Sequence, residues 1–284
     1  MSNVIKISLP QSNPHAPAVN VYLLPKQKFL IDAGPANTKS LILLKKVLSN
    51  YDLTLTNLNG IILTHHHTDH IGLLKMLPHS IPLFCDKAIK YYGSKQYLND
   101  IRNNVNNMQL SNTIKKELIE HLSSRYCPYI NNYKIYPISD IPFIVNSMCG
   151  HSSSDSVIHI QDMLFTGDLI LKGIYFNNLL DINPKTKKIQ KKQAFDFLES
   201  LSKIKKMNNI NKICPGHGTT LEFQKGVQII NKNIKALKKH HAQLLTLPST
   251  LSYSEIKAIM FPKALKVPDY FYLSELYSFI KQKH

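Results

Sequence analysis

The sequence predicts an α/β fold that carries a helical insertion and a small helical appendage at its C-terminal end. Short apolar runs of strand length alternate with longer segments of helical period, and no internal repeat points to a solenoid or a propeller. Residues 94–131 are polar, rich in asparagine and helical in their spacing, which predicts the insertion. The segment after residue 221 is mostly helical, and Pro248, Pro262 and Pro268 divide it into short helices.

The first third of the chain reads as short strands followed by a helix. Val19–Leu24 and residues 29–32 are compact apolar runs, and the turn residues 25–28 between them predict a hairpin. A helix is predicted after Asn37, with one face formed by the apolar side chains Leu41, Leu44, Val47 and Leu48. Residues 61–63 then predict a buried strand that runs directly into a cluster of histidines.

The rest of the chain continues this alternation. Strands are predicted at residues 133–136, 143–146, 157–160, 163–166 and 212–214, and a helix at residues 192–206. We therefore expect a main domain at residues 1–222 and a C-terminal helical appendage at residues 223–284. The insertion at residues 94–131 is either a lid over an active site or an ordinary surface excursion.

The net charge of the 284-residue chain is +17, and most of it lies in the second part. Residues 172–284 contain 20 lysines and 7 acidic residues, a balance of +13. This balance favours an anionic partner such as RNA, a membrane surface or an acidic substrate. A solvated lysine surface is the competing interpretation, because Arg102 and Arg125 are the only arginines and nucleic-acid readers favour arginine forks.

The cysteines and the apolar runs exclude other classes. Cys85, Cys127, Cys149 and Cys214 form no CxxC pair, which argues against a cysteine-built zinc site and a disulfide framework. We expect them as small buried side chains. No apolar run is long enough to span a bilayer, and the N-terminus lacks the apolar stretch of a secretory signal, so we expect a cytoplasmic protein.

A dense cluster of metal-binding residue types follows the predicted strand at residues 61–63. Residues 64–70 read Thr-His-His-His-Thr-Asp-His, in which His65, His67, Asp69 and His70 form the pattern H-x-H-x-D-H. Neutral imidazoles and carboxylates are ligands that zinc takes in proteins. A pair of histidines alone would be weak evidence, but four such residues at this spacing allow one loop to supply two neighbouring metals.

Three more ligand candidates lie downstream, each beside a glycine near the end of a predicted strand. They are His151 in Gly-His, Asp168 in Thr-Gly-Asp and His217 in Pro-Gly-His-Gly. Glycine lets the backbone turn sharply at such a point. Together with the first cluster these residues make seven ligands, enough for two metals with positions left open for water and substrate.

The ordered set HHHTDH, GH, TGD and PGHG resembles the metallo-β-lactamase superfamily, in its glyoxalase II-like branch of hydrolases. The runs at residues 19–24 and 31–35 also resemble that branch, so the resemblance extends from about residue 4 to about residue 222. It implies an αββα sandwich with a catalytic domain at residues 1–222. Residues 252–280 loosely resemble the helical tail of some bacterial members and of the β-lactamase-like endoribonuclease.

The resemblance also implies a role for each ligand. One metal ion is expected on His65, His67 and His151, and a second on Asp69, His70 and His217, with Asp168 bridging the two. His66 falls in the variable position between two ligands, and Asp32 matches a position that supports the metal loop by hydrogen bonding.

Two features depart from the family pattern. Cys149 stands where the family usually has proline, and the glyoxalase II pattern after Asp168 is missing, as is a basic pair for glutathione. Tyr175 is a candidate hydrogen-bond donor to the substrate, with a core tyrosine as the competing interpretation. Lys172 is a candidate for binding an anionic substrate group.

These residues predict a binuclear metal-dependent hydrolase with two Zn²⁺ ions, iron or manganese being the alternatives. Two such metals share a water and lower its pKa to roughly 7, so that a hydroxide, oriented by Asp69, attacks a small ester, thioester or lactone. The alternative is an endoribonuclease or phosphodiesterase that acts on RNA, as the basic C-terminal part suggests. A non-enzymatic regulator is a third hypothesis, against which the complete ligand set argues. The oligomeric state is left open.

Overall fold

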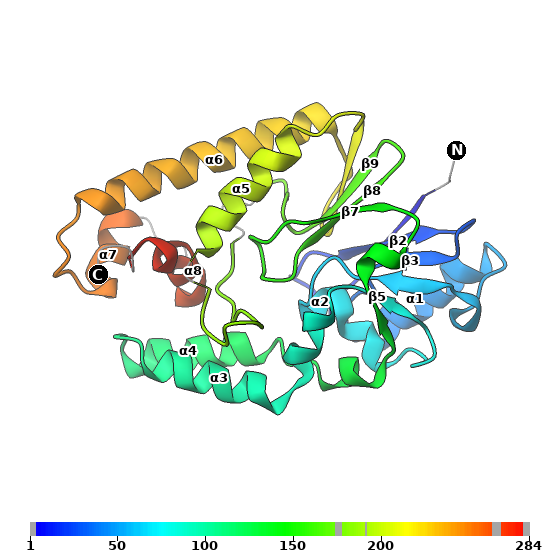
Figure 1. The fold of residues 1–284 in the computed structure, drawn as a ribbon, viewed down its shortest axis with the longest axis horizontal. Helices are drawn as coiled ribbons and strands as arrows, with labels where there is room; N and C mark the ends of the chain where they lie inside the picture. Colours follow the sequence, from blue (N-terminus) through cyan, green and yellow to red (C-terminus); the bar gives the residue numbers. More distant parts are fainter. Residues whose placement is uncertain (1–3, 174–177, 191, 263–267, 281–284) are drawn as a thin grey trace.

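The computed structural model describes residues 4–173, 178–190, 192–262 and 268–280, which form two β-sheets and the helices that cover them (Figure 1). The first sheet has the strand order β1-β2-β3-β4-β5-β6 and the second β11-β10-β9-β8-β7. In the first sheet β2 is antiparallel to its neighbours β1 and β3, and the later neighbours are parallel. In the second sheet β9 and β10 are parallel and the other pairs are antiparallel.

The strands are short and mostly buried. Their bounds are β1 Ile5–Leu9, β2 Val19–Leu24, β3 Phe29–Ile31, β4 Gly60–Ile62, β5 Leu83–Phe84, β6 Ile135–Tyr136, β7 Ile144–Ser147, β8 Ser156–Ile160, β9 Met163–Gly167, β10 Lys212–Pro215 and β11 Leu221–Glu222. The predicted hairpin is present as β2 and β3, and Lys28 adopts a φ of 56° in its turn. The sequence analysis missed β1, β5 and β11. Two of them, β5 and β11, have two residues each and so carry little pattern, whereas the alternating residues of β1 are a strand signal that it overlooked.

Several of the helices begin at a capping side chain. Their bounds are α1 Thr38–Ser49, α2 Thr68–Ile71, α3 Lys95–Asn106, α4 Asn112–Ser123, α5 Gln193–Lys205, α6 Phe223–Thr246, α7 Tyr253–Met260 and α8 Asp269–Ile280. Asn37, Ser94 and Ser111 cap α1, α3 and α4, because each side chain accepts a hydrogen bond from a backbone N–H of the first turn. The predicted helical insertion is therefore present as α3 and α4. Within the described ranges, no helix combines the length and the apolar character needed to cross a bilayer.

Three hydrophobic clusters arrange these elements in four layers. The two sheets enclose one cluster, to which Tyr22 and Ile62 of the first sheet and Phe165 of the second contribute. The outer face of the second sheet packs against α5 and α6 through a cluster that includes Phe197 and Ile230. The largest cluster lies on the outer face of the first sheet. The arrangement is the predicted αββα sandwich.

The insertion and the C-terminal helices share one hydrophobic core. Leu118 of α4 and Leu273 of α8 belong to the same cluster as Leu83 of the first sheet. Figure 1 shows α3 and α4 along one side of the molecule, with α7 and α8 between them and the far end of α6. The division of the chain at residue 222 into a main domain and an appendage remains a prediction. In the structure, the shared core joins the last helix to the first sheet and to the insertion.

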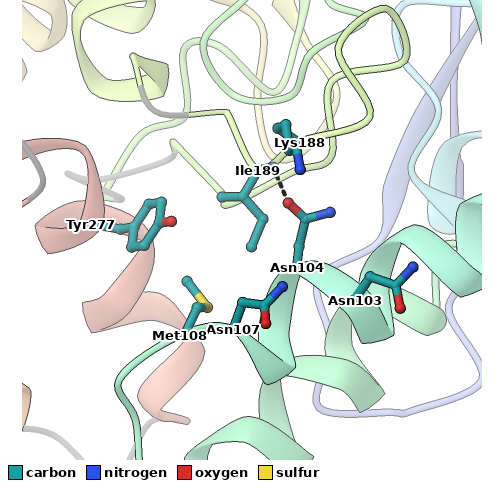
Figure 2. A pocket seen from close by; sticks show the side chains of 7 residues that line it. All are labelled: Asn103, Asn104, Asn107, Met108, Lys188, Ile189 and Tyr277. Carbon is teal, nitrogen blue, oxygen red and sulfur yellow. Dashed lines mark hydrogen bonds between the residues drawn. The ribbon is translucent and has the colours of Figure 1, made fainter.

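A surface pocket of about 310 Å³ lies where α3, the segment before α5 and α8 meet (Figure 2). Asn104 forms part of its wall, and its Oδ1 accepts a hydrogen bond from the backbone N–H of Ile189 at 3.2 Å. Asn103, Asn107 and Tyr277 also line it. None of the seven predicted metal ligands contributes to this lining, so the pocket is separate from the candidate metal site.

Candidate metal centre

The histidine cluster lies in the turn that connects β4 to α2. Three of its histidines, His65, His66 and His67, precede the helix, and His70 lies inside it. The backbone N–H of His70 donates to the carbonyl of His67 at 2.9 Å, which closes the first helical turn. This turn brings Asp69 and His70 beside the preceding loop. All four histidines are buried.

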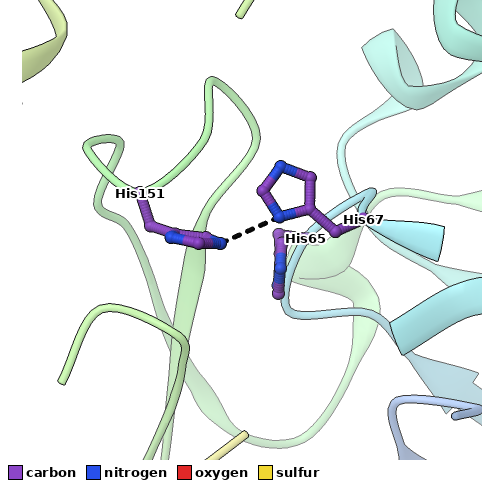
Figure 3. A group of neighbouring side chains, drawn as sticks. All are labelled: His65, His67 and His151. Atoms are coloured by element: carbon purple, nitrogen blue, oxygen red, sulfur yellow. Dashed lines mark hydrogen bonds between the residues drawn. The ribbon is translucent and has the colours of Figure 1, made fainter. Parts of the chain in front are cut away.

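The first group of candidate ligands consists of three histidines from two loops. His65, His67 and His151 have ring nitrogens that all lie within 4.8 Å of one another. Nε2 of His151 is 2.8 Å from Nδ1 of His67, and Figure 3 shows the three rings converging on a common point. Because a neutral imidazole presents one nitrogen lone pair, three such rings form a set of nitrogen ligands for one cation.

The second group combines a carboxylate with two histidines. Asp69, His70 and His217 also have ligand atoms within 4.8 Å of one another. Nε2 of His217 lies 3.3 Å from Oδ2 of Asp69, and Nε2 of His70 lies 3.9 Å from the same oxygen. The orientation of the His217 ring is fixed by a hydrogen bond on the side away from Asp69, because its Nδ1 donates to the carbonyl of Ala18 at 2.9 Å.

Asp168 lies between the two groups. Its Oδ1 is 3.3 Å from Nε2 of His70, and its Oδ2 is 3.4 Å from Nε2 of His217. Oδ2 is also 3.8 Å from Nε2 of His151, a member of the first group. One buried carboxylate therefore contacts histidines of both groups, which is the arrangement expected of a residue that bridges two cations.

The second sheet brings Asp168 and His217 together. The parallel strands β9 and β10 end side by side, so the residues that follow them leave the sheet at the same edge. The backbone N–H of Gly216 donates to the carbonyl of Gly167 at 2.7 Å. A Cβ at Gly216 would lie 2.3 Å from Oδ1 of Asp168, so glycine is required for this close approach.

Asp32 supports the metal loop from the end of β3. It is buried and has a φ of 61°, a left-handed conformation that aspartate tolerates better than most residues. Its Oδ1 accepts from the backbone N–H of Thr64, and its Oδ2 accepts from the hydroxyl of Thr64, both at 2.8 Å. Oδ2 also lies 2.8 Å from Nδ1 of His70. The N–H of His70 is thus directed to Asp32, and its Nε2 faces Asp168.

Burial and neighbouring charges shift the pKa values of the candidate histidines in opposite directions. Burial, aided by other histidines, lowers the pKa of His65 and His67 well below the ordinary value. Burial also opposes the charging of His70, but Asp168 and Asp69 outweigh it and raise its pKa well above the ordinary value. For His217 the hydrogen bonds to Asp168 and Asp69 outweigh burial and raise the pKa to about 10.

The arrangement fits a metal ion. Nε2 of His65 is buried and has no hydrogen-bond partner among the described residues, although an orphaned buried nitrogen of this kind is costly. Nδ1 of His67 and Nε2 of His151 direct lone pairs at each other unless a proton or a cation lies between them. Five imidazoles and two carboxylates that converge in this way match the donor set of zinc and related metals.

The two predicted substrate residues are not among the side chains of the metal site that the structure describes. Lys172 is exposed and lines a pocket whose other walls come largely from Lys225, Gln228 and Lys232 of α6, not from the ligand-bearing loops. Tyr175 lies outside the described residues. The sequence analysis missed the buried acid Asp181. The sign that could have revealed it is a single carboxylate between apolar residues, Leu180 and Ile182.

Comparisons with known proteins agree with this geometry. The family model described as the metallo-beta-lactamase superfamily matches residues 16–217. The chain is 28% identical to the probable metallo-hydrolase YqjP of Bacillus subtilis (strain 168) over 203 residues, which are 66% of this chain and 63% of that protein. The match therefore spans less than two thirds of the length of that relative.

Two further similarities are more distant. The hydroxyacylglutathione hydrolase of Shewanella sp. (strain ANA-3) is 22% identical over 219 residues, which are 77% of this chain and 67% of that protein. The crystal structure of a metallo-beta-lactamase family protein from Thermus thermophilus superposes with a TM-score of 0.73 at 18% identity, covering 100% of this chain and 94% of that one. At this identity the structural similarity establishes the fold.

Proposed function

The chain belongs to the metallo-beta-lactamase superfamily, and from this premise we propose that it is a metal-dependent hydrolase with a two-metal site that acts on small esters, thioesters or lactones. The observation that carries the proposal is the position of Asp168. Its two oxygens lie 3.3 Å and 3.4 Å from His70 and His217 of one ligand group, and Oδ2 lies 3.8 Å from His151 of the other. A single carboxylate that contacts both groups is suited to a pair of cations.

The proposed ligand assignment follows the geometry. One metal would be held by His65, His67 and His151, and the second by Asp69, His70 and His217, while Asp168 contacts histidines of both groups. Zinc suits this mixture of nitrogen and oxygen ligands, while iron and manganese remain alternatives because the same ligands accept several metals.

Metal ions bound at such a site lower the pKa of a water molecule and polarise the substrate oxygen that is attacked. The residues of the chain position the reactants. The side chain of Asp69 is 29% exposed, whereas that of Asp168 is 9% exposed, so Asp69 is the carboxylate that an incoming water can reach. Asp69 accepts a hydrogen bond from this water and orients it, whereas Asp168 stays fixed between the two histidine groups.

Two observations support a hydrolase that acts on a small molecule. The similarity to a protein named hydroxyacylglutathione hydrolase favours cleavage of an ester-like bond, although 22% identity does not carry the substrate over. Arg125, one of the two arginines, is 5% exposed and paired inside the protein, so it is withdrawn from any contact with RNA phosphates. Lys172 and Tyr175 remain candidates for substrate contacts.

A phosphodiesterase acting on RNA is the second candidate function. The observation that favours it is the pocket of about 350 Å³ that three lysines line, Lys172 at the end of the Asp168 loop and Lys225 and Lys232 on α6. Lysines that line a surface hollow suit a phosphate-bearing substrate. Lysine binds phosphate as a point charge and reads no sequence, so this surface would bind RNA without sequence preference.

The two candidates differ in their response to salt and to substrate. The test measures turnover of an aryl ester, a thioester, a lactone and a labelled RNA by the protein loaded with Zn²⁺, and RNA affinity over a series of salt concentrations. Turnover of one of the carbonyl substrates without RNA affinity supports the proposal. RNA cleavage, with an affinity that falls steeply as salt rises, supports the phosphodiesterase instead. A protein that binds no metal would contradict both.

A further inference from the structure

A buried polar network lies behind the candidate metal centre. It links this centre to the helical insertion and to the C-terminal helix α8. At its centre is Asp181, which lies between β9 and α5 and is 0% exposed. Its neighbours Leu180 and Ile182 are equally buried. A buried carboxylate persists only where hydrogen bonds and an opposite charge compensate for the loss of water. The partners of Asp181 are therefore informative.

Asp181 contacts both loops that supply the first group of ligands. Its Oδ2 accepts hydrogen bonds from the backbone N–H of Ser153 at 3.0 Å and from the hydroxyl of Ser153 at 2.6 Å. Ser153 lies two residues after His151. The same oxygen is 3.5 Å from Nε2 of His66, which stands between His65 and His67.

The ring of His66 is held by a stacked tyrosine and by a hydrogen bond. It stacks on the ring of Tyr92 with a centroid distance of 3.5 Å and an interplanar angle of 9°. Its Nδ1 lies 2.8 Å from the hydroxyl of Ser154, and the hydroxyl of Tyr92 donates to Oδ2 of Asp181 at 3.2 Å. His66 therefore does not point into the metal centre. It anchors the loop on which two ligands are carried.

The cation beside Asp181 comes from the end of the insertion. Arg125 follows α4, is 5% exposed and places Nη1 3.6 Å from Oδ1 of Asp181. The same nitrogen donates to the carbonyl of Leu180 at 2.8 Å. Nη2 of Arg125 contacts the hydroxyl of Tyr270, and that hydroxyl also donates to the carbonyl of Leu180 at 3.0 Å.

Tyr270 connects the network to the C-terminal helix. It lies in the first turn of α8, and its backbone N–H donates to Oε1 of Glu117 in α4 at 2.8 Å. Its ring stacks on His121 of α4 with a centroid distance of 4.7 Å. α8 is thus attached to the insertion at the point where Arg125 leaves it.

From this continuity we infer that Arg125 and Tyr270 are positioning residues for the metal centre. They hold Asp181, and Asp181 in turn holds the two loops that carry His65, His67 and His151. The insertion and the C-terminal helix supply none of the proposed ligands. Metal affinity nevertheless depends on them, because Arg125 and Tyr270 hold Asp181 in place. The inference rests on the proposed function, because it takes these histidines to be metal ligands.

The experiment uses the full chain and four variants of the network. Arg125→Met removes the charge, Arg125→Lys keeps it, Asp181→Asn removes the carboxylate, and Tyr270→Phe deletes one hydroxyl. The matched control is Lys257→Met, which removes the 2.5 Å ion pair of Lys257 with Asp269 at the start of α8 but leaves Asp181 untouched. Each protein is measured for Zn²⁺ affinity by chelator competition, for the visible spectrum after Co²⁺ loading and for its thermal unfolding midpoint.

We expect Arg125→Met and Asp181→Asn to weaken Zn²⁺ binding by about 10- to 100-fold, the range typical of residues that orient ligands. Their Co²⁺ spectra change, because the ligand geometry changes, while Arg125→Lys recovers part of the affinity. Lys257→Met leaves affinity and spectrum unchanged even where it lowers the unfolding midpoint. If Asp181→Asn does not fold, Tyr270→Phe decides, with a smaller loss in the same direction.

Folded network variants that bind Zn²⁺ as tightly as the unmodified protein would overturn the inference and leave the proposed function intact. Conversely, a protein that shows the expected losses of metal but hydrolyses no carbonyl substrate would remove the proposed function and leave the inference standing. A protein that binds neither Zn²⁺ nor Co²⁺ overturns both.

Discussion

Oδ2 of Asp32 lies 2.8 Å from Nδ1 of His70, and both side chains are buried. The two residues are 38 positions apart in the sequence. Because the same carboxylate also accepts two hydrogen bonds from Thr64, it requires a donor from His70, which places the ring proton on Nδ1. Nε2 is then directed toward Asp168, and its lone pair becomes available to a metal ion once this nitrogen gives up its proton.

Asp32→Asn should therefore weaken Zn²⁺ binding. The amide presents its N–H or its carbonyl to His70 but cannot satisfy Thr64 and the ring at once, so the orientation of the ring is lost. We expect a loss of about 10- to 100-fold in metal affinity, measured by chelator competition. Asp52→Asn is the control, because Asp52 also has a positive φ, 56°, but is exposed. Equal affinities in the two variants would contradict the role of Asp32.

Asp168→Ala should remove one metal ion and most of the activity. The substitution deletes a carboxylate that contacts histidines of both ligand groups within 4 Å. Elemental analysis of the purified variant should show about half the metal of the unmodified protein, in line with one of two ions lost. Asp140→Ala, at an exposed position, serves as the control. Undiminished metal content would show that Asp168 does not bridge.

Gly216→Ala should disturb the metal centre although it replaces none of the proposed ligands. The added Cβ would lie 2.3 Å from Oδ1 of Asp168 and 2.5 Å from Cε1 of His70, so one of them must move. We expect weaker Zn²⁺ binding and an altered Co²⁺ spectrum. In Gly226→Ala the new Cβ meets the flexible end of Ile213 at 2.2 Å, so this control should lose stability but keep its metal. The outcome that counts against the argument is a normal spectrum for Gly216→Ala.

Metal binding at pH 7.5 should release protons. His70 and His217 are protonated in the metal-free protein, because their carboxylate neighbours raise the pKa of His217 to about 10 and that of His70 well above its ordinary value. Coordination requires neutral rings, so each of these two histidines gives up a proton. His65 and His67 are already neutral and release none. Calorimetry in buffers of different ionisation enthalpy measures the number, and no dependence on the buffer would refute the assignment.

The same raised pKa values set the stability of the metal-free protein. A histidine whose pKa is raised on folding stabilises the fold fully below its ordinary pKa of 6.5, and this contribution is lost as the pH rises through about 10 for His217. Urea unfolding of the metal-free protein should therefore give a free energy of unfolding that falls between pH 6.5 and pH 9. His217→Gln should show a shallower fall. A rise in stability over this window would be inconsistent with the charge arrangement described.

Much of the site was predictable because its chemistry is local. The residue types in the segment from His65 to His70, and the glycines beside His151, Asp168 and His217, indicate metal ligands from the sequence alone. Asp32 was accessible only through a family resemblance, because an isolated aspartate before a glycine also suits an ordinary turn. The strands that end at these ligands were predicted by their apolar runs, while the two-residue strands β5 and β11 carry too little pattern to be recognised.

Asp181 and Arg125 show where such reasoning stops. Neither belongs to a motif, and they lie 56 positions apart, yet they form a buried ion pair behind the ligand loops. A charged residue has no period or spacing that indicates burial, since its partner is chosen by packing and not by sequence distance. The insertion, which the sequence left as either a lid or a surface excursion, contributes Arg125 to that pair.

The sequence by itself determined the layered α/β class, the superfamily and the kinds of side chain at the metal site, because apolar periodicity and ligand spacing are properties of neighbouring residues. Only the tertiary structure decided that Asp168 contacts both histidine groups, that His66 faces Tyr92 and Asp181, and that the C-terminal helix reaches the network through Tyr270. These relationships join segments far apart in the chain, and they exist only after the sheets and helices have packed.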